Sequence, residues 1–336
     1  MSNQPSNYQS CRILICTALL ICVVLLPPIL HGGERDTDSP PPLPHLVIAR
    51  QGDTPASIAQ RYLNDASKAW MIVEYNGIAA YSGGDPVMVP ITPFKPGGLT
   101  PDGYQTVPVL AYADIGESIG QARQVSRSDF NYQMHWLKSE GFIAITPKQL
   151  TEFMEFSGQL PHRSVLITFD TASHSLHEIG IPLLKELGFT ATVFVATNGV
   201  GGKGAMTWDQ IKQIHRDGFT IGCRGQSGRS LTRRTKGQAF ETYFKLVESE
   251  LRLARQAIET HLDEPCLFLA YPQGDTNSLV SAMAAKLGFA AAFIRRAGDN
   301  PFFADRFRIH RTPINQEMNL EQFGQSLTTR ITADLH

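Results

Sequence analysis

Residues 164–171 read Ser164-Val-Leu-Ile-Thr-Phe-Asp170-Thr171, an apolar run that ends at an acidic residue. A short apolar run closed by a polar turn is typical of a strand buried on both faces. Similar runs recur along the chain, and helical patterns lie between them. This alternation predicts an α/β fold in which helices cover a parallel sheet. We therefore expect Asp170 to begin the loop at the carboxyl end of a strand.

The predicted elements of this sheet extend almost to the end of the chain. The strands are residues 107–112, 165–169, 191–196, 219–223, 266–271 and 290–294, and helical patterns cover residues 181–187, 208–215 and 239–262. Two cysteines fall in this region, Cys223 and Cys266, at the end of one predicted strand and the start of another. In a parallel barrel these positions are too far apart to bridge, so we expect two free buried thiols.

Three stretches resemble motifs of the polysaccharide deacetylase (NodB homology) family. The run ending at Asp170-Thr171 is similar to the family's TFDD signature, and residues 107–114 are similar to its first strand. Tyr271-Pro-Gln-Gly274 is similar to its Tyr-Pro-Tyr-Gly motif. The resemblance implies a distorted (β/α) barrel over residues 106–330. It also implies the family's activity, the metal-dependent removal of N-acetyl groups from polysaccharides.

The metal ligands that the resemblance calls for are replaced. In the family, the second Asp of the signature and two histidines of a His-x-x-x-His turn hold the metal. Here Thr171, Arg224 and Gly228 stand at these three places. A catalytic zinc-type site needs about three protein ligands and an open position for water. We therefore expect no metal and no other cofactor in this domain, and no catalysis.

The energetic loss is large. A bound metal lowers the pKa of its water from about 15.7 to about 7. At 1.36 kcal/mol per pKa unit, this is roughly 12 kcal/mol of help in forming hydroxide. A lone carboxylate cannot supply that help.

Some family positions are retained. The resemblance places Asp170 at the general base and the main-chain N–H of Gln273 where the substrate carbonyl is polarised. His310 is a candidate general acid. Functional side chains of parallel barrels lie at the carboxyl ends of the strands, so we expect Asp170, Arg224, Gln273 and Asp275 to converge there.

Arg224 has two interpretations. Its guanidinium can occupy the place of the metal and pair with Asp170, or it can be a solvated side chain on a loop. A pair would keep Asp170 ionised without activating water, because Arg does not deprotonate and has no open coordination position.

A relocated metal site is an alternative. His174 and His177 follow Asp170 at an i, i+3 spacing. If the loop starts a helix, both face one side and form a three-ligand set with Asp170. In that case the domain would be an active de-N-acetylase.

Residues 45–92 resemble a LysM module, a small βααβ unit that binds glycans containing N-acetylglucosamine. The strand from Leu46 leads into Gly52-Asp53-Thr54, a turn and helix N-cap. A second helix ends at Asn76-Gly77-Ile78, and a closing strand runs from Asp85 to Pro90. We expect Trp70 and Tyr75 in its small core.

The resemblance assigns the glycan groove of this module to its two turns. The residues are Gly52, Asp53, Thr54, Asn76, Gly77 and Ile78. Asp53, Thr54 and Asn76 also suit a purely structural role as caps of helices and turns.

The N-terminal segment is apolar from Ile13 to Leu26 and follows a single early positive charge, Arg12. Residues 1–30 are therefore interpreted as a signal peptide or an apolar membrane-anchoring helix. Residues 31–44 and 93–105 are interpreted as linkers. We expect an exported protein, either membrane-anchored or secreted, that faces the periplasm or the cell wall.

The charge balance argues against a nucleic-acid partner. The 336 residues carry a net charge of −1 and a pI of about 6.8, without a basic footprint. The leading hypothesis is an envelope protein that binds N-acetylglucosamine-containing glycan through residues 45–92 and carries an inactive deacetylase barrel. The alternatives are the active enzyme described above and a non-catalytic scaffold for a partner enzyme of the envelope.

Overall fold

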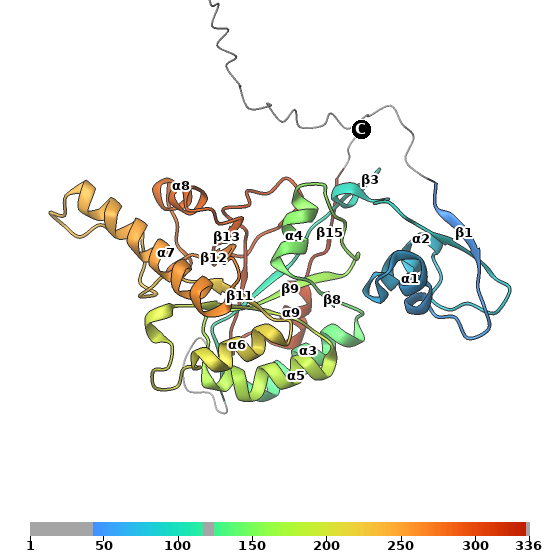
Figure 1. The fold of residues 1–336 in the computed structure, drawn as a ribbon, viewed down its shortest axis with the longest axis horizontal. Coiled ribbons are helices and arrows are strands. Elements are labelled where there is room, and N and C mark those ends of the chain that lie inside the picture. Colours follow the sequence, from blue (N-terminus) through green and yellow to red (C-terminus); the bar gives the residue numbers. More distant parts are fainter. Residues whose placement is uncertain (1–42, 117–123, 334–336) are drawn as a thin grey trace, which may run out of the picture. The chain divides into compact units, whose positions relative to one another are not determined.

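The structure is a computed structural model that describes residues 43–116 and 124–333 (Figure 1). The apolar segment 1–30, and the linker up to residue 42, lie outside the described residues. Within the described ranges, no helix combines the length and apolar character required to cross a bilayer.

Residues 45–89 form a strand, two helices and a strand, in the order expected from the sequence. The elements are β1 (His45–Ile48), α1 (Pro55–Leu63), the 3-10 turn η1 (Ala66–Lys68), α2 (Ala69–Asn76) and β2 (Pro86–Val89). β1 and β2 pair antiparallel, with His45 opposite Val89. The core contains Ala49, Ile58, Ala59, Ile72, Val87 and Val89.

Two aromatic residues do not lie where the sequence predicts. Trp70 is half-buried, and Tyr75 is 38% exposed and packs edge-on against the ring of Phe94. The prediction that they fill the small core is wrong, because aliphatic residues of α1, α2 and β2 already close it.

Side-chain hydrogen bonds fix the ends of the two helices. Thr54 caps α1 by accepting from the Ser57 N–H, and Pro55 occupies the first turn, where no N–H is needed. Asn76 ties α2 to β2. Its amide donates to the carbonyls of Ile72 and Met88, at 2.8 Å each, and accepts from the Met88 N–H at 2.9 Å.

Part of the segment interpreted as a second linker is structured. It contains the 3-10 turn η2 (Pro96–Gly98), β3 (Leu99–Thr100) and β4 (Gly103–Gln105). β4 pairs antiparallel with β3 and with β15 (Arg330–Thr332), near the end of the chain.

The main sheet is parallel throughout its described pairings. Its order is β13-β12-β11-β10-β9-β5-β14, and β8 also pairs with β9. The strands are β5 (Val109–Tyr112), β8 (Ile143–Ala144), β9 (Ser164–Phe169), β10 (Thr192–Val195), β11 (Thr220–Cys223), β12 (Phe268–Ala270), β13 (Ala291–Phe293) and β14 (Thr312–Ile314).

The sheet curls because the segment that contains Ile309 and β14 contacts β13 at one end of the sheet and β5 at the other. Ile309 forms a parallel bridge with Phe293 of β13, and three residues later β14 pairs with β5. The structure therefore confirms a curled parallel sheet of the (β/α) type.

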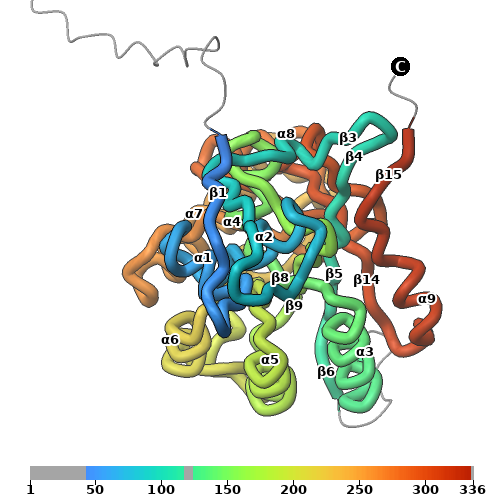
Figure 2. Tube along the Cα trace, turned by 90° about the vertical axis from the view of Figure 1, so that its right-hand side faces the viewer, coloured from blue at the N-terminus to red at the C-terminus, as the bar shows by residue number. Residues whose placement is uncertain are grey.

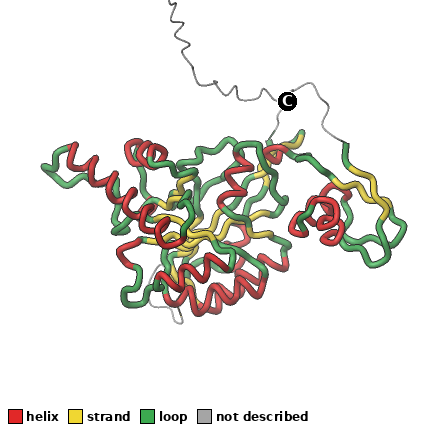
Figure 3. Tube along the Cα trace, in the orientation of Figure 1, coloured by secondary structure: helices red, strands yellow, loops and turns green. Residues whose placement is uncertain are grey.

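Helices surround these strands (Figure 3). They are α3 (Arg127–Ser139), α4 (Pro147–Met154), α5 (Ile181–Leu187), α6 (Trp208–Arg216), α7 (Phe240–Leu262), α8 (Ser278–Lys286) and α9 (Leu320–Gln325). The remaining elements of this region are three short helical turns and a small two-stranded sheet. The turns are η3 (Leu176–Gly180), η4 (Thr197–Gly199) and η5 (Pro272–Gly274), and the sheet is the parallel pair β6 (Asp114–Gly116) and β7 (Gln124–Ser126). Figures 1 and 2 both place α3, α5 and α6 side by side along one flank of the strands.

The sequence patterns account for this arrangement. Every residue of β9 is buried, as a continuous apolar strand in a covered parallel sheet requires. Helix α5 has the predicted bounds, and α6 and α7 differ from the predicted ones by one residue at one end. In the described part of the chain, Cys223 and Cys266 are free and buried, as predicted. Burial raises the pKa of the Cys223 thiol to about 12.

The Asn76 bonds give a first prediction. Replacing Asn76 with Ala removes the two bonds to Met88 of β2 and the one to Ile72 within α2, which we expect to cost about 1–3 kcal/mol of local stability. Hydrogen exchange of the Met88 amide should accelerate by about tenfold or more. Lys68→Ala, which removes an exposed contact of 4.0 Å to Asp65, is the control and should leave it unchanged. Equal exchange rates in both variants would contradict this role of Asn76.

Candidate functional site

The polar residues singled out by the sequence lie at the carboxyl ends of the strands. Asp170 directly follows β9, and Arg224 directly follows β11. Both line a pocket of about 290 Å³ together with Asp114 and Lys203. The rest of the lining consists of Thr171, Ala172, Ser173, Val195, Ala196, Gly199, Val200, Gly204 and Ala205. The pocket therefore lies where parallel barrels hold their functional groups.

The carboxylate of Asp170 is buried in ion pairs. Arg311 Nη1 lies 2.7 Å from Oδ1, and Arg295 Nε lies 3.9 Å from Oδ2. The side chains of Arg311 and Asp170 are 0% and 3% exposed, so water screens this pair very little. Arg311 also donates from Nη1 to Thr168 Oγ1 at 3.2 Å, which fixes the guanidinium beside β9.

Arg224 lies next to Asp170 but contacts a different group from the expected one. Its Nη1 donates to the main-chain carbonyl of Asp170 at 2.7 Å. The expected ion pair was between Arg224 and Asp170, whereas the ion pairs found with the carboxylate are those of Arg311 and Arg295. Among the described residues, three guanidinium groups thus surround Asp170.

These charges decide the ionisation of Asp170. Burial by itself raises the pKa of the carboxyl. The positive charges of Arg311, Arg224 and Arg295, and the hydrogen bond from Arg311, outweigh burial and hold the pKa below its ordinary value. Asp170 is therefore an ionised, fully engaged carboxylate and a weakened base.

The other two residues that the resemblance places at metal-ligand positions have structural roles. Thr171 donates from Oγ1 to the carbonyl of Ala113 at 2.8 Å, which joins the loop after β9 to the end of β5. Gly228 has φ +70°, a left-handed conformation that a histidine would adopt only under strain.

Gln273 lies beside this turn. Its Nε2 donates to the carbonyl of Gly228 at 3.2 Å, and its own φ is +61°, which is uncommon for a residue other than glycine. The next residue, Gly274, packs against Arg295: a Cβ there would lie 2.2 Å from the Cβ of Arg295. The strained turn thus positions Arg295 as well as the main chain of Gln273. Asp275 is exposed and is not among the residues that line the pocket.

His310 does not line the pocket. Its Nδ1 lies 3.2 Å from the carbonyl of Arg296, and its main chain bonds to the side chain of Asn300. The chain at this point does bring a cation to Asp170, but through the neighbouring residue, Arg311.

The alternative ligand set is not assembled. The main-chain N–H of His174 donates to the carbonyl of Gly204, and the ring atom Nδ1 of His177 lies 2.9 Å from Glu178 Oε1. Within residues 43–116 and 124–333, no group of three or more His, Cys, Asp or Glu side chains is placed to hold a metal ion.

Asp114 is the second carboxylate in the pocket wall. Its Oδ1 accepts from Ser173 Oγ at 2.6 Å, from Ser175 Oγ at 2.8 Å and from the Ile115 N–H at 2.9 Å. These hydrogen bonds hold the side chain of Asp114 in place.

The sequence analysis missed Arg295 and Arg311. Arg295 follows β13 by two residues, so its place after a predicted strand was an available signal. Arg311 directly precedes β14, a strand that was not predicted, and its partner lies 141 positions away. Only the pairing of β14 with β5 brings it to the end of β9.

The six residues assigned to the glycan groove lie in two turns, and some have structural bonds. Two hydrogen bonds from Arg61, at 3.0 and 2.5 Å, and one from the Arg50 N–H hold the pKa of Asp53 well below its usual range. Thr54 and Asn76 are bonded as described above. Gly52 and Gly77 have φ of +81° and +70°, and Ile78 is 46% exposed.

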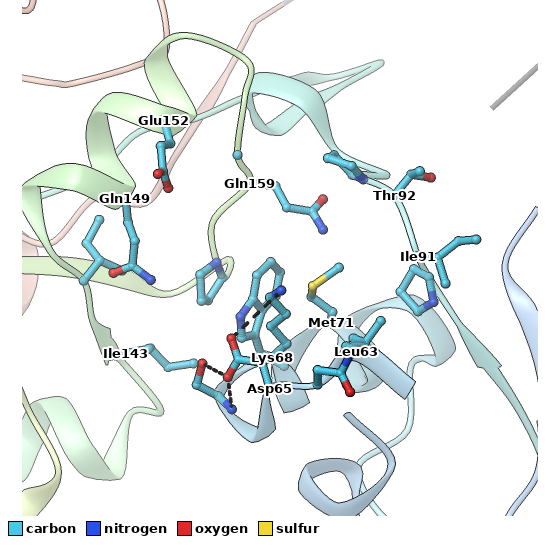
Figure 4. Close-up of a pocket in the computed structure, with 18 of the residues that line it drawn as sticks. Leu63, Asp65, Lys68, Met71, Ile91, Thr92, Ile143, Gln149, Glu152 and Gln159 are labelled. Atoms are coloured by element: carbon cyan, nitrogen blue, oxygen red, sulfur yellow. Dashed lines mark hydrogen bonds and ion pairs between the residues drawn. The ribbon is translucent and has the colours of Figure 1, made fainter. Parts of the chain in front are cut away.

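A larger pocket, of about 690 Å³, is separate from the Asp170 pocket (Figure 4). Its wall includes Leu63, Asp65, Lys68, Met71, Ile91, Thr92, Ile143, Gln149, Glu152 and Gln159. It contains none of the residues that the sequence marked for chemistry or for glycan binding. Size alone therefore does not identify the site.

Sequence comparison shows what part of the chain is similar to. Residues 157–292 match the family described as polysaccharide deacetylase. The chain is 24% identical over 218 residues to YxkH of Bacillus subtilis (strain 168), whose name places it among the polysaccharide deacetylases. This match covers 65% of the chain and 75% of that protein.

A second relative is the poly-beta-1,6-N-acetyl-D-glucosamine N-deacetylase of Staphylococcus aureus (strain MRSA252). It is 25% identical over 175 residues, which cover 50% of the chain and 60% of that enzyme. The chain thus spans less than two thirds of this relative.

Solved structures share the fold. The deacetylase PplD of Streptococcus pyogenes, in complex with acetate, matches with a TM-score of 0.60 and 19% identity over 66% of this chain and 98% of that chain. IcaB from Ammonifex degensii matches with a TM-score of 0.57 and 22% identity over 67% and 95%. Residues 157–292 therefore resemble polysaccharide deacetylases in sequence, and the chain shares the fold of the two solved structures.

The buried pair gives a second prediction. Asp170→Asn removes the carboxylate charge that pairs with the buried Arg311, so we expect a loss of about 3–5 kcal/mol of unfolding free energy at neutral pH. The folded pKa of Asp170 lies below the unfolded value of about 3.9. The stability that its ionisation contributes is thus complete at neutral pH and is lost as pH falls below about 4.

Urea unfolding of both proteins at pH 7 and pH 3 measures this effect. The difference between wild type and Asp170→Asn should shrink at the lower pH. The exposed Asp299→Asn is the control and should unfold like the wild type at both. A difference that is small at pH 7, or that grows on acidification, would contradict the ion-pair assignment.

Proposed function

We propose that this protein binds N-acetylglucosamine-containing glycan in the cell envelope and that its polysaccharide deacetylase domain does not hydrolyse it. One observation carries the proposal. The carboxylate at the general-base position is enclosed by Arg311 and Arg295, and Arg224, at a ligand position of the family, bonds the same residue.

The chemistry of the donor set supports a non-catalytic domain. Guanidinium groups are cations without an acceptor or an open coordination position, so they repel a divalent metal and activate no water. Thr171, at another ligand position, uses its hydroxyl to bond the main-chain carbonyl of Ala113, and Gly228, at the remaining position, has no side chain. The residues present therefore do not fit the metal that the family's reaction requires.

The glycan class is proposed from two sources. The Staphylococcus aureus relative is named for poly-beta-1,6-N-acetyl-D-glucosamine. The resemblance of residues 45–92 to LysM points to the same sugar, with Gly52, Asp53, Thr54, Asn76, Gly77 and Ile78 at the groove. Their structural bonds suit this role, because turns locked by caps present their main-chain amides in a fixed position.

The cellular location is proposed from the apolar segment 13–26. An export signal or anchor there would bring the chain to the glycan it is proposed to bind. A partner enzyme of the envelope that binds this protein would then be held close to the glycan.

Acetate release tests the non-catalytic role. The full protein, incubated with N-acetylglucosamine oligomers and with zinc, cobalt or nickel, should release no acetate above the rate of a protein-free control. The Staphylococcus aureus relative, assayed in parallel, validates the conditions. Turnover that a metal stimulates, and that Asp170→Asn abolishes, would establish an active deacetylase and end the proposal.

Glycan binding by residues 45–92 is tested at Ile78. Ile78→Asp places a charge on an exposed apolar residue of the proposed groove and should weaken binding of N-acetylglucosamine oligomers by about tenfold or more in calorimetric titration. Ile48→Asp is the matched control, since Ile48 is 58% exposed on β1 outside the groove. Equal affinities of the two variants would place the glycan elsewhere.

A further inference from the structure

We infer that the larger pocket, which Trp70 lines, is a second glycan site and binds a neutral oligosaccharide of N-acetylated sugars (Figure 4). Its volume of about 690 Å³ lies within the range of about 300–1,000 Å³ that is typical of ligand pockets. The inference rests on the proposed function for the class of glycan. It assigns this glycan to a site that is separate from the groove of residues 52–54 and 76–78.

The Trp70 pocket has walls from two parts of the chain. Residues between 62 and 71 and residues 90–93 form one wall, and residues between 143 and 161 form most of the other. A hydrogen bond joins the same two parts of the chain, because Glu74 Oε1 accepts from the main-chain N–H of His162 at 2.7 Å. The pocket therefore exists only in the chain that contains both parts.

Helices α1 and α2 separate this pocket from the proposed groove. Helix α1 is capped by Thr54, in the groove, and ends at Leu63, in the pocket wall. Helix α2 runs back from Ala69, beside Trp70, to Asn76 in the groove. Its eight residues span about 12 Å. The two sites thus lie at opposite ends of the same helices and share no residue.

Trp70 supplies an apolar surface for a sugar ring. It is half-buried, lines the pocket and is not among the residues of the aliphatic core described above. A sugar ring presents C–H groups on its faces, and a flat indole offers a rigid apolar area of matching shape. Met71 and Ile91 also line the pocket and suit the methyl of an N-acetyl group.

Amide and hydroxyl groups of the wall provide hydrogen bonds. Gln159 uses Oε1 for the main-chain N–H groups of Phe94 and Lys95, at 3.0 and 3.2 Å. Its Nε2 is buried and has no hydrogen-bond partner among the described residues. Buried donors are normally satisfied, and the carbonyl of an N-acetyl group or a sugar hydroxyl at this wall would satisfy it. Thr92 and Ser157 add hydroxyl groups to the lining.

The charges of the wall favour a neutral ligand. Two carboxylates line the pocket, those of Asp65 and Glu152, and Figure 4 shows them on different walls. Lys68 Nζ lies 4.0 Å from Asp65 Oδ2, and Lys148 Nζ lies 3.9 Å from Glu152 Oε1. Each carboxylate thus has a cation beside it, so a charged ligand gains little from this wall. A ligand with an apolar face and many neutral hydroxyl groups fits it best.

The test is a calorimetric titration of the full protein carrying Ile78→Asp, the groove substitution, with the N-acetylglucosamine tetramer. The tetramer should still bind, with an affinity that salt does not change, because it carries no charge. The glucosamine tetramer, which has the same length but is cationic, should bind at least about tenfold less tightly. Adding Trp70→Ala should weaken binding of the N-acetylated tetramer by about tenfold or more. Adding Tyr132→Ala instead, at an aromatic residue of α3 that is 66% exposed and outside the pocket, is the control and should leave the affinity unchanged.

A second substitution keeps the outcome clear. If Trp70→Ala unfolds the protein, Glu152→Ala on the opposite wall replaces it and should weaken tetramer binding by about fivefold or more. No residual binding in the Ile78→Asp protein, an affinity that neither substitution lowers, or tighter binding of the glucosamine tetramer would overturn the inference.

The same titrations separate the second site from the proposed function. Equal affinities of the single variants Ile78→Asp and Ile48→Asp would sink the groove, and acetate release would sink the non-catalytic role. Neither result removes binding that depends on Trp70. Complete loss of binding in the Ile78→Asp protein would sink only the Trp70 pocket.

Discussion

The buried pair between Asp170 and Arg311 is the interaction on which the site depends. It joins the end of β9 to the residue before β14, and so connects two strands that lie on either side of β5. The face of the Phe194 ring, 5.3 Å from the Arg311 guanidinium carbon, covers the cation from the side of β10. Such a pair adds little net stability compared with an apolar core, but losing one partner is costly. The rest of the pocket is arranged around this constraint.

The same geometry explains how a fold of this kind can change the residues of its pocket and keep its shape. In a parallel barrel the loops after the strands carry function, while the strands carry stability. Thr171, Arg224 and Gly228 are loop residues, so their identities change the charge of the pocket without disturbing the buried strands. Arg224, at a position that the resemblance assigns to a metal ligand, lies beside Asp170 together with the guanidinium groups of Arg295 and Arg311.

Sequence reasoning recovered the parts of the structure that local patterns encode. The continuous apolar runs predicted β9 to β13, and the deacetylase-like motifs placed Asp170 and Arg224 at neighbouring loops. It did not recover the partner of Asp170. Arg311 is brought there by β14, a three-residue strand without a strong apolar pattern, over a long separation in the chain. In residues 45–92 the helix and turn signals were sufficient, but the packing of Trp70 and Tyr75 depends on neighbours that local patterns do not specify.

Anomalous X-ray diffraction from crystals soaked in zinc would test most directly whether guanidinium groups have taken the place of the metal. The account predicts no zinc peak at Asp170, with Arg311 Nη1 still within hydrogen-bonding distance of the carboxylate. A zinc ion about 2.0–2.2 Å from a carboxylate oxygen of Asp170, with Arg311 displaced, would contradict it.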